Sequence, residues 1–167
     1  MSTVIGGSDG PTSIFLAGKI GGFSVGWLNI FGLILMILIL LPNMIYAHKF
    51  KDAENKCTNK VMNITEQVGR YSTMFLMVFN IGIAELGFSS IEACLIYGVG
   101  NLILLAAYWC FWLLYFKEQK MAYALALAII PTGIFLLSGI TMRHILLIVT
   151  SVIFGIGHIY VSYANNK

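Results

Sequence analysis

The residues with the clearest capacity for chemistry lie near the start of the chain, in a glycine-rich stretch. It supplies one carboxylate, two hydroxyls and three glycines: Asp9, Ser8, Thr12, Gly6, Gly7 and Gly10. Carboxylate, hydroxyl and carbonyl oxygens are hard ligands for small cations, and transporters hold coupling ions in loops that interrupt helices. The pattern therefore predicts a site for a small cation around Asp9. Two other interpretations stay open: an anion at the start of the helix that Pro11 begins, or Asp9 as the cap of a turn.

The stretch 5–17, IGGSDGPTSIFLA, resembles the signature of the β subunits of sodium-translocating decarboxylases. In that family a Gly-Gly-x-Asp-Gly-Pro-Thr segment lies within the membrane region, and its aspartate is implicated in sodium binding. The resemblance implies that Asp9 binds Na⁺ and that the glycines and Thr12 shape the loop. Because the β subunits are much longer and have further functional segments, it implies a sodium site and not a complete pump. The rest of the chain resembles only uncharacterised small bacterial membrane proteins.

Polar side chains within the apolar segments form a second set of candidates. Glu85 lies near the outer end of an apolar segment, and Asn80 and Asn101 fall near the middle of two segments. Ionisable residues at membrane depth are functional candidates by default. We therefore expect Glu85 and a hydrogen-bonded Asn80–Asn101 pair to line a polar route. The alternatives are that Glu85 reaches the membrane interface and that the asparagines only join neighbouring helices.

His158 completes the predicted polar route, at a depth similar to that of Asn43 and Tyr108. A lone histidine within a helix is also typical of a hydrogen-bonded packing residue. The sequence contains no Gly-x-Ser-x-Gly elbow, zinc motif or Walker loop, so a catalytic role is the less favoured one, with an enzyme that acts on lipid left open. No cofactor other than Na⁺ is indicated.

The elements that would position these residues follow from composition. The chain has 167 residues, of which 59% are hydrophobic and 10% charged, and its mean hydropathy is +0.87. A soluble domain is about 45–50% apolar and about 25% charged. This difference excludes a soluble globular enzyme, a disordered chain and a nucleic-acid-binding module. The sequence predicts an all-α integral membrane protein whose main partner is the lipid bilayer.

Five segments are long and apolar enough to cross a bilayer of about 30 Å. They are 27–47, 71–88, 91–116, 121–142 and 144–163, and the second could begin near Val61. We expect residues 27–167 to form a five-helix bundle. Residues 1–26 would form a Gly-rich segment with a short helix that packs on the bundle or dips into the membrane.

Basic residues fix the predicted orientation, since Lys and Arg are enriched on the cytoplasmic side. With five spans, eight fall on the side of the C-terminus, namely Lys49, Lys51, Lys56, Lys60, Arg70, Lys117, Lys120 and Lys167. Only Lys19 and Arg143 fall on the other side. The bias predicts an external N-terminus and a cytoplasmic C-terminus, in the cytoplasmic membrane of a bacterium.

Two functions fit these features. The first is a small transport protein, or a transporter-like subunit, that binds Na⁺ near the outer side through Asp9. The second is a non-catalytic interaction or accessory protein, such as a sensor or immunity subunit, in which the N-terminal segment is a docking element. A homodimer or a larger membrane complex is compatible with both, because five spans cannot form two matched halves.

Overall fold

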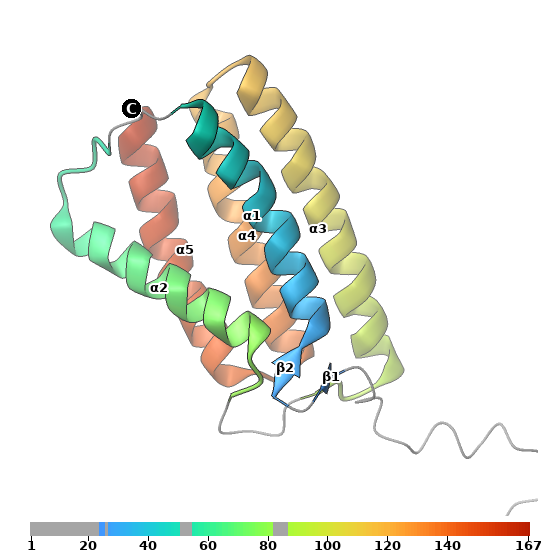
Figure 1. Cartoon of the computed structure of the whole chain (residues 1–167). Coiled ribbons are helices and arrows are strands. Elements are labelled where there is room, and N and C mark those ends of the chain that lie inside the picture. The colour runs from blue at the N-terminus through green and yellow to red at the C-terminus, as the bar shows by residue number, and fades with distance from the viewer. Residues whose placement is uncertain (1–23, 26, 51–54, 82–86) are drawn as a thin grey trace, which may run out of the picture.

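A computed structural model describes residues 24–25, 27–50, 55–81 and 87–167. The described part of the chain is helical apart from one short ribbon. The helices are α1 Ile30–Lys49, α2 Lys60–Val78, α3 Ile91–Lys117, α4 Met121–Thr141 and α5 Ile145–Asn166, and the ribbon pairs β1 Ser24–Val25 with β2 Leu28–Asn29. Figure 1 shows the helices side by side, with α2 inclined to the others.

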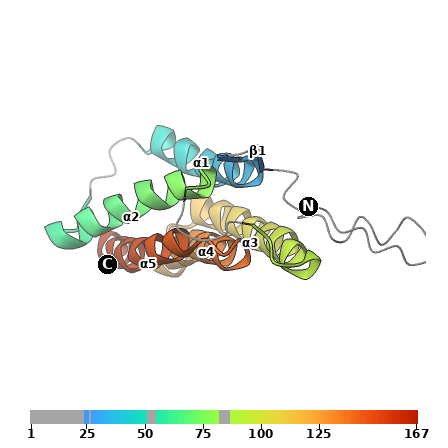
Figure 2. The same ribbon diagram turned by 90° about the horizontal axis from the view of Figure 1, so that it is seen from below.

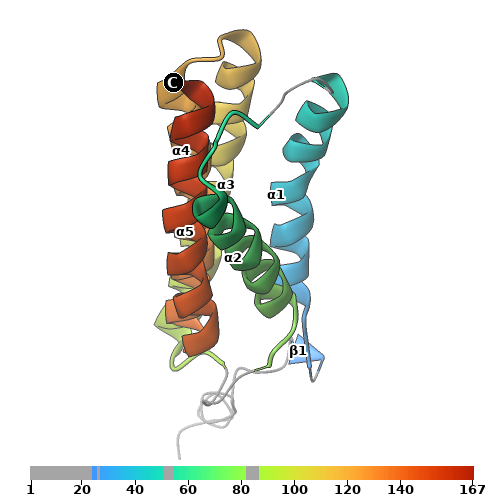
Figure 3. The same cartoon turned by 90° about the vertical axis from the view of Figure 1, so that its left-hand side faces the viewer.

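The helices form two layers. Seen from below, α3, α4 and α5 lie in one row, and α1 and α2 lie together on its face (Figure 2). Within the row α4 and α5 each follow a short turn, which makes sequence neighbours antiparallel and adjacent. Helix α2 crosses obliquely over α5 and separates it from the lower part of α1 (Figure 3). The α2–α5 crossing is therefore the main contact between the two layers.

Four of the described helices are long and apolar enough to span a membrane: α1, α3, α4 and α5. Their bounds match four of the predicted segments to within a few residues, so the chain is a helical, multi-pass membrane protein. Helix α2 is not among the four, because Lys60, Glu66 and Arg70 make it less apolar than the others. The count of five spans, and the orientation, remain predictions.

The predicted bounds of the second helix, 71–88, were wrong. Helix α2 begins at Lys60, near the alternative start at Val61, because the Asn59 side chain accepts hydrogen bonds from the amides of Val61 and Met62. This is the usual role of an N-cap asparagine. The helix ends at Val78 because Phe79 is extended and pairs with Leu28. The chain therefore leaves the helix at Val78 and enters an extended connection at Phe79.

That extended connection ties the start of α1 to the end of α2. The backbone amide of Asn80 donates to the carbonyl of Trp27 over 2.8 Å, and the rings of Trp27 and Phe79 stack with centroids 5.4 Å apart. At the same end of the bundle the amide of Gly87 donates to the carbonyl of Met142. The turn between α4 and α5 and the connection after α2 therefore lie together.

The opposite end of the bundle collects the loop after α1 and the C-terminus. The backbone amides of Lys56 and Cys57 donate to the side chain of Asn165 over 2.8 and 3.1 Å. The helices thus run alternately between two ends, as five antiparallel segments would. The lysine-rich loop, the α3–α4 turn and the C-terminus share one end, which agrees with the sides assigned from the sequence.

Candidate functional site

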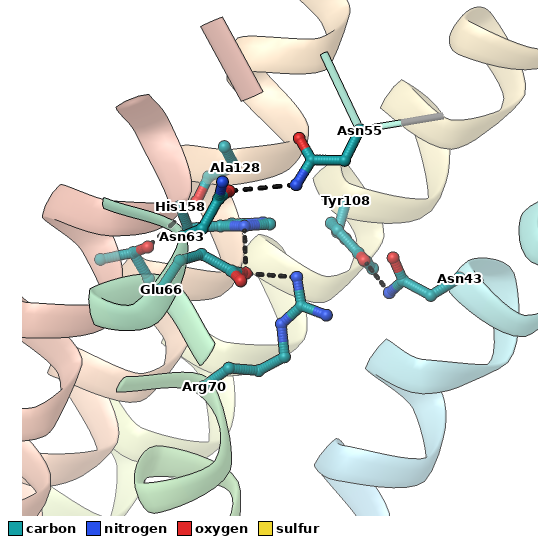
Figure 4. Close-up of polar contacts among 9 residues, drawn as sticks. Asn43, Asn55, Asn63, Glu66, Arg70, Tyr108, Ala128 and His158 are labelled. Carbon is teal, nitrogen blue, oxygen red and sulfur yellow. Dashed lines mark hydrogen bonds and ion pairs between the residues drawn. The ribbon is translucent and has the colours of Figure 1, made fainter. Parts of the chain in front are cut away.

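The described polar group with the most unusual environment is Glu66, a carboxylate in the interior of the two-layer fold. Its exposed fraction is 4%. Arg70, one turn later on α2, forms a hydrogen bond and ion pair with Glu66 Oε1. From α5, His158 Nδ1 lies 3.1 Å from the same oxygen. Figure 4 shows the carboxylate between the guanidinium and the imidazole.

Two glycines allow α2 to approach α5 closely enough for this contact. A Cβ atom at Gly69 would lie 2.6 Å from the backbone of Phe154, and one at Gly157 would lie 2.6 Å from the amide nitrogen of Glu66. Each glycine thus faces the backbone of the other helix. The ring of His158 also stacks on that of Phe154, with centroids 4.7 Å apart. The crossing therefore fixes both the carboxylate and the imidazole.

Opposing effects act on the pKa of Glu66. Burial raises it, while the hydrogen bond from His158 and the charge and hydrogen bond of Arg70 lower it and prevail, so the pKa lies below its ordinary value. The carboxylate is then ionised at neutral pH and can only accept hydrogen bonds. His158 must therefore carry a proton on Nδ1. Since Glu66 is already paired with a cation, it is not a free ligand for Na⁺.

A cavity of about 120 Å³ lies beside this group, between α1, α2, α3, α4 and α5. Its polar lining consists of Arg70, His158, Asn43 and Tyr108, and the remaining lining is apolar. Asn43 Nδ2 donates to the Tyr108 hydroxyl over 2.6 Å and to the carbonyl of Ile39 over 2.8 Å. The structure therefore brings His158, Asn43 and Tyr108, for which the sequence predicted a similar depth, to one cavity.

A comparison with protein families identifies the family of this chain. The model of the family described as Vps55, vacuolar protein sorting 55, matches residues 5–120. The chain belongs to the Vps55 family. No curated protein and no solved structure matches it. The match includes α1, α2 and α3 with Glu66 and Arg70, whereas His158 lies beyond it.

Most of the predicted cation site falls within the matched part of this Vps55-family chain but outside the described residues. This applies to the whole glycine-rich set and to the outer carboxylate, that is to Gly6, Gly7, Ser8, Asp9, Gly10, Thr12 and Glu85. The resemblance to the decarboxylase β subunits rests on the same residues, so the sodium site and its Na⁺ remain predictions. The N-terminal segment 1–26 is described only at residues 24–25.

The predicted Asn80–Asn101 pair was wrong. Asn80 follows the end of α2, where its backbone pairs with Trp27, and so it is not halfway along a helix. Asn101 is buried in α3 and donates instead to the Ser138 hydroxyl of α4 over 3.1 Å. Both Oδ1 atoms are buried and have no partner among the described residues. Asn101 thus joins two adjacent helices, which was the alternative role for the pair.

Glu66 and Arg70 were not among the predicted site residues. They lie in the stretch 48–70, whose alternating charges are typical of a solvated loop. Two signals could have found them: the four-residue spacing of Glu66 and Arg70, which places them on one helix face, and Asn59 as a start signal. No such signal identifies α5 as the partner helix, because its contact with α2 depends on glycines in two segments that are far apart in the sequence.

Proposed function

We propose that this chain is a non-catalytic accessory protein of the membrane that binds another membrane protein and takes part in its sorting. Membership of the Vps55 family carries the proposal, since the description of that family names protein sorting. It corresponds to the second of the two functions expected from the sequence. Such a role requires a stable membrane scaffold with a surface for a partner, and no reacting group.

The Glu66–Arg70–His158 contact supports the scaffold part of the proposal. Glu66 binds Arg70 on its own helix α2 and His158 on α5. Buried ion pairs are costly to break when one partner is removed, because the other charge is left uncompensated. The contact therefore holds the polar helix α2 in one position on the apolar helix α5. In this role the carboxylate positions a helix and transfers nothing.

Helix α1 supports the binding part of the proposal. It is attached through one stripe of buried residues, Gly32, Met36, Ile39 and Pro42. On other faces Ile37 and Met44 are exposed by 55% and 68%. Figure 3 shows the upper part of α1 standing apart from the α3–α5 row. An apolar helix held by one stripe leaves room for a partner helix in the membrane, where association depends on close packing.

Photo-crosslinking in the native membrane tests this function. A photoreactive residue at Ile37 should give one discrete protein adduct, and deletion of the chain should then displace that protein from its membrane. The matched control is Leu102, an equally apolar position of α3 with an exposed fraction of 66%. Equal labelling at both positions, or an adduct that contains only a second copy of the chain, would contradict the proposal. The second result would identify the homodimer instead.

The glycine-rich stretch favours a second function, the binding of Na⁺ at Asp9 by a transporter-like subunit of a bacterial cytoplasmic membrane. If Na⁺ binds only the folded state, stability rises by about 2.7 kcal/mol at a hundredfold excess over Kd. Asp9→Asn should abolish this gain, Glu85→Gln should weaken it less, and Glu92→Gln at the exposed start of α3 should leave it unchanged. Equal melting temperatures in Na⁺ and K⁺ would refute this function and leave the sorting role untouched.

A further inference from the structure

We propose that the cavity beside Arg70 is a binding site for an anionic phospholipid, with one acyl chain in the cavity and the phosphate at the guanidinium. The site is independent of the sorting role, because it uses the inner side of α1 and not its exposed face. Its lining residues come from both layers of the fold. A lipid there would fill the space between α1 and the α3–α5 row.

The floor of the cavity suits an acyl chain. Met36 and Ile39 from α1, Phe135 from α4 and Phe154 from α5 are buried and apolar, with exposed fractions of 2–4%. The volume of about 120 Å³ is close to that of an engineered apolar cavity of about 150 Å³, which stays dry and binds benzene. A segment of an acyl chain fits such a space, and the rest of the lipid would leave through the open side.

The rim of the cavity suits a phosphate. The side chain of Arg70 is 45% exposed, while that of its partner Glu66 is 6% exposed. In the described contacts Arg70 uses Nη2 for Glu66, and a guanidinium has five N–H donors in all. Figure 4 shows the other side of the guanidinium turned away from Glu66. An incoming anion would therefore meet free N–H donors, with the carboxylate behind them.

Charge complementarity selects an anionic headgroup. The Arg70–Glu66 pair is neutral as a whole. The positive charge that would attract an anionic lipid therefore comes from the lysines at the neighbouring end of the bundle. There α1 ends at Lys49, α2 begins at Lys60 and α3 ends at Lys117. Basic sites between membrane helices on the lysine-rich side are typical of binding sites for anionic headgroups. A zwitterionic lipid would bring the same acyl chain but no net negative charge.

Native mass spectrometry of the detergent-purified chain tests the site with three probes: phosphatidylglycerol, phosphatidylcholine with the same acyl chains, and inorganic phosphate. We expect one phosphatidylglycerol to be retained at least about tenfold more tightly than phosphatidylcholine, as suits charge-assisted hydrogen bonds to a phosphate. Equal retention of both lipids would overturn the proposal. So would phosphate that binds alone and competes with the lipid at the same concentration, since the site would then be one for a free anion.

Matched variants locate the binding. Arg70→Gln alone leaves a buried carboxylate, so the double variant Glu66→Gln/Arg70→Gln removes the guanidinium without leaving that charge. Leu40 is a half-buried residue of the cavity wall, so Leu40→Trp narrows the cavity and leaves Arg70 at the rim intact. Both should lower phosphatidylglycerol retention about tenfold, whereas Arg143→Gln, at the exposed turn of the opposite end, should not. Unchanged retention in both folded cavity variants would overturn the site.

Discussion

The buried carboxylate of Glu66 is held by two partners of different kinds, and the two should be separable by mutation. Arg70 supplies charge from the same helix, and His158 supplies a hydrogen bond from α5. Only the second contact joins two helices. We therefore expect both partners to keep the carboxylate ionised, and the histidine alone to convert that ion into a contact between α2 and α5.

Removal of Arg70 alone should cost more than removal of Glu66 alone. Arg70→Gln leaves a buried, uncompensated carboxylate and should lower the free energy of unfolding by about 3 kcal/mol. Glu66→Gln leaves only a half-exposed guanidinium and should cost about 1–2 kcal/mol. The double variant should cost less than the sum of the two, as coupled residues do. Chemical unfolding in detergent measures this, and additive costs would show that the ion pair is not coupled.

His144 gives a prediction about pH. It lies in the turn between α4 and α5, where Nδ1 accepts a hydrogen bond from the amide of Leu147, and burial lowers its pKa below the ordinary value of 6.5. A lowered pKa in the folded state means that protonation favours unfolding. Stability should therefore be complete above about pH 6.5 and fall as the pH decreases below it.

The variant His144→Asn should flatten this pH dependence, because asparagine can still cap α5 but does not titrate. His48→Gln, at the exposed end of α1, is the control and should keep the wild-type profile. The melting temperatures of both variants are measured between pH 5 and pH 8, the range in which histidine titrates. A wild-type profile in His144→Asn would assign the dependence to another group.

At the scale of elements, the α2–α5 crossing depends on Gly69 and Gly157. Gly69→Ala places a methyl group against the backbone of Phe154, so it should destabilise the protein by about 1–3 kcal/mol. The matched control is Gly98→Ala, because Gly98 is within α3 and has nothing within 4 Å of an added Cβ. At that position alanine has a higher helix propensity than glycine and should stabilise the protein by up to about 1 kcal/mol. Thermal unfolding of both variants checks the contrast, and equal effects would mean that the two helices do not meet closely.

The same elements show what the sequence could predict. Helices α1, α3, α4 and α5 were predictable because an uninterrupted apolar run of their length has no other stable state in a bilayer. Helix α2 was not, since its polar half resembles a loop and its apolar half continues into an extended connection at Phe79. The spacing of Glu66 and Arg70 was readable as a helix face. Their contact with His158 was not, because it depends on how two distant segments cross.

At the scale of the whole molecule, the two layers explain why charged residues occur in so apolar a chain. Helices α3, α4 and α5 form a row that faces lipid, with exposed residues such as Leu102 and Ile153. Helix α2 brings its charges onto the inner face of that row, where His158 and Arg70 meet at the cavity. Glu66 is thus enclosed between the two layers, while Arg70 stays half exposed at the cavity.

The last prediction concerns the orientation of the molecule. Lys56 lies beside the C-terminus through its bond to Asn165, and Ser89 lies at the other end, next to the α3 start. The bias of Lys and Arg predicts that the first end is cytoplasmic. Single cysteines at these two positions, in a chain whose own three cysteines are replaced, should differ in intact cells. An impermeant thiol reagent should label Ser89→Cys and spare Lys56→Cys, and lysis should expose both. Because the two positions mark opposite ends of the same bundle, the reverse pattern would invert the topology without altering the fold, whereas equal labelling in intact cells would mean that the bundle does not separate them across a bilayer.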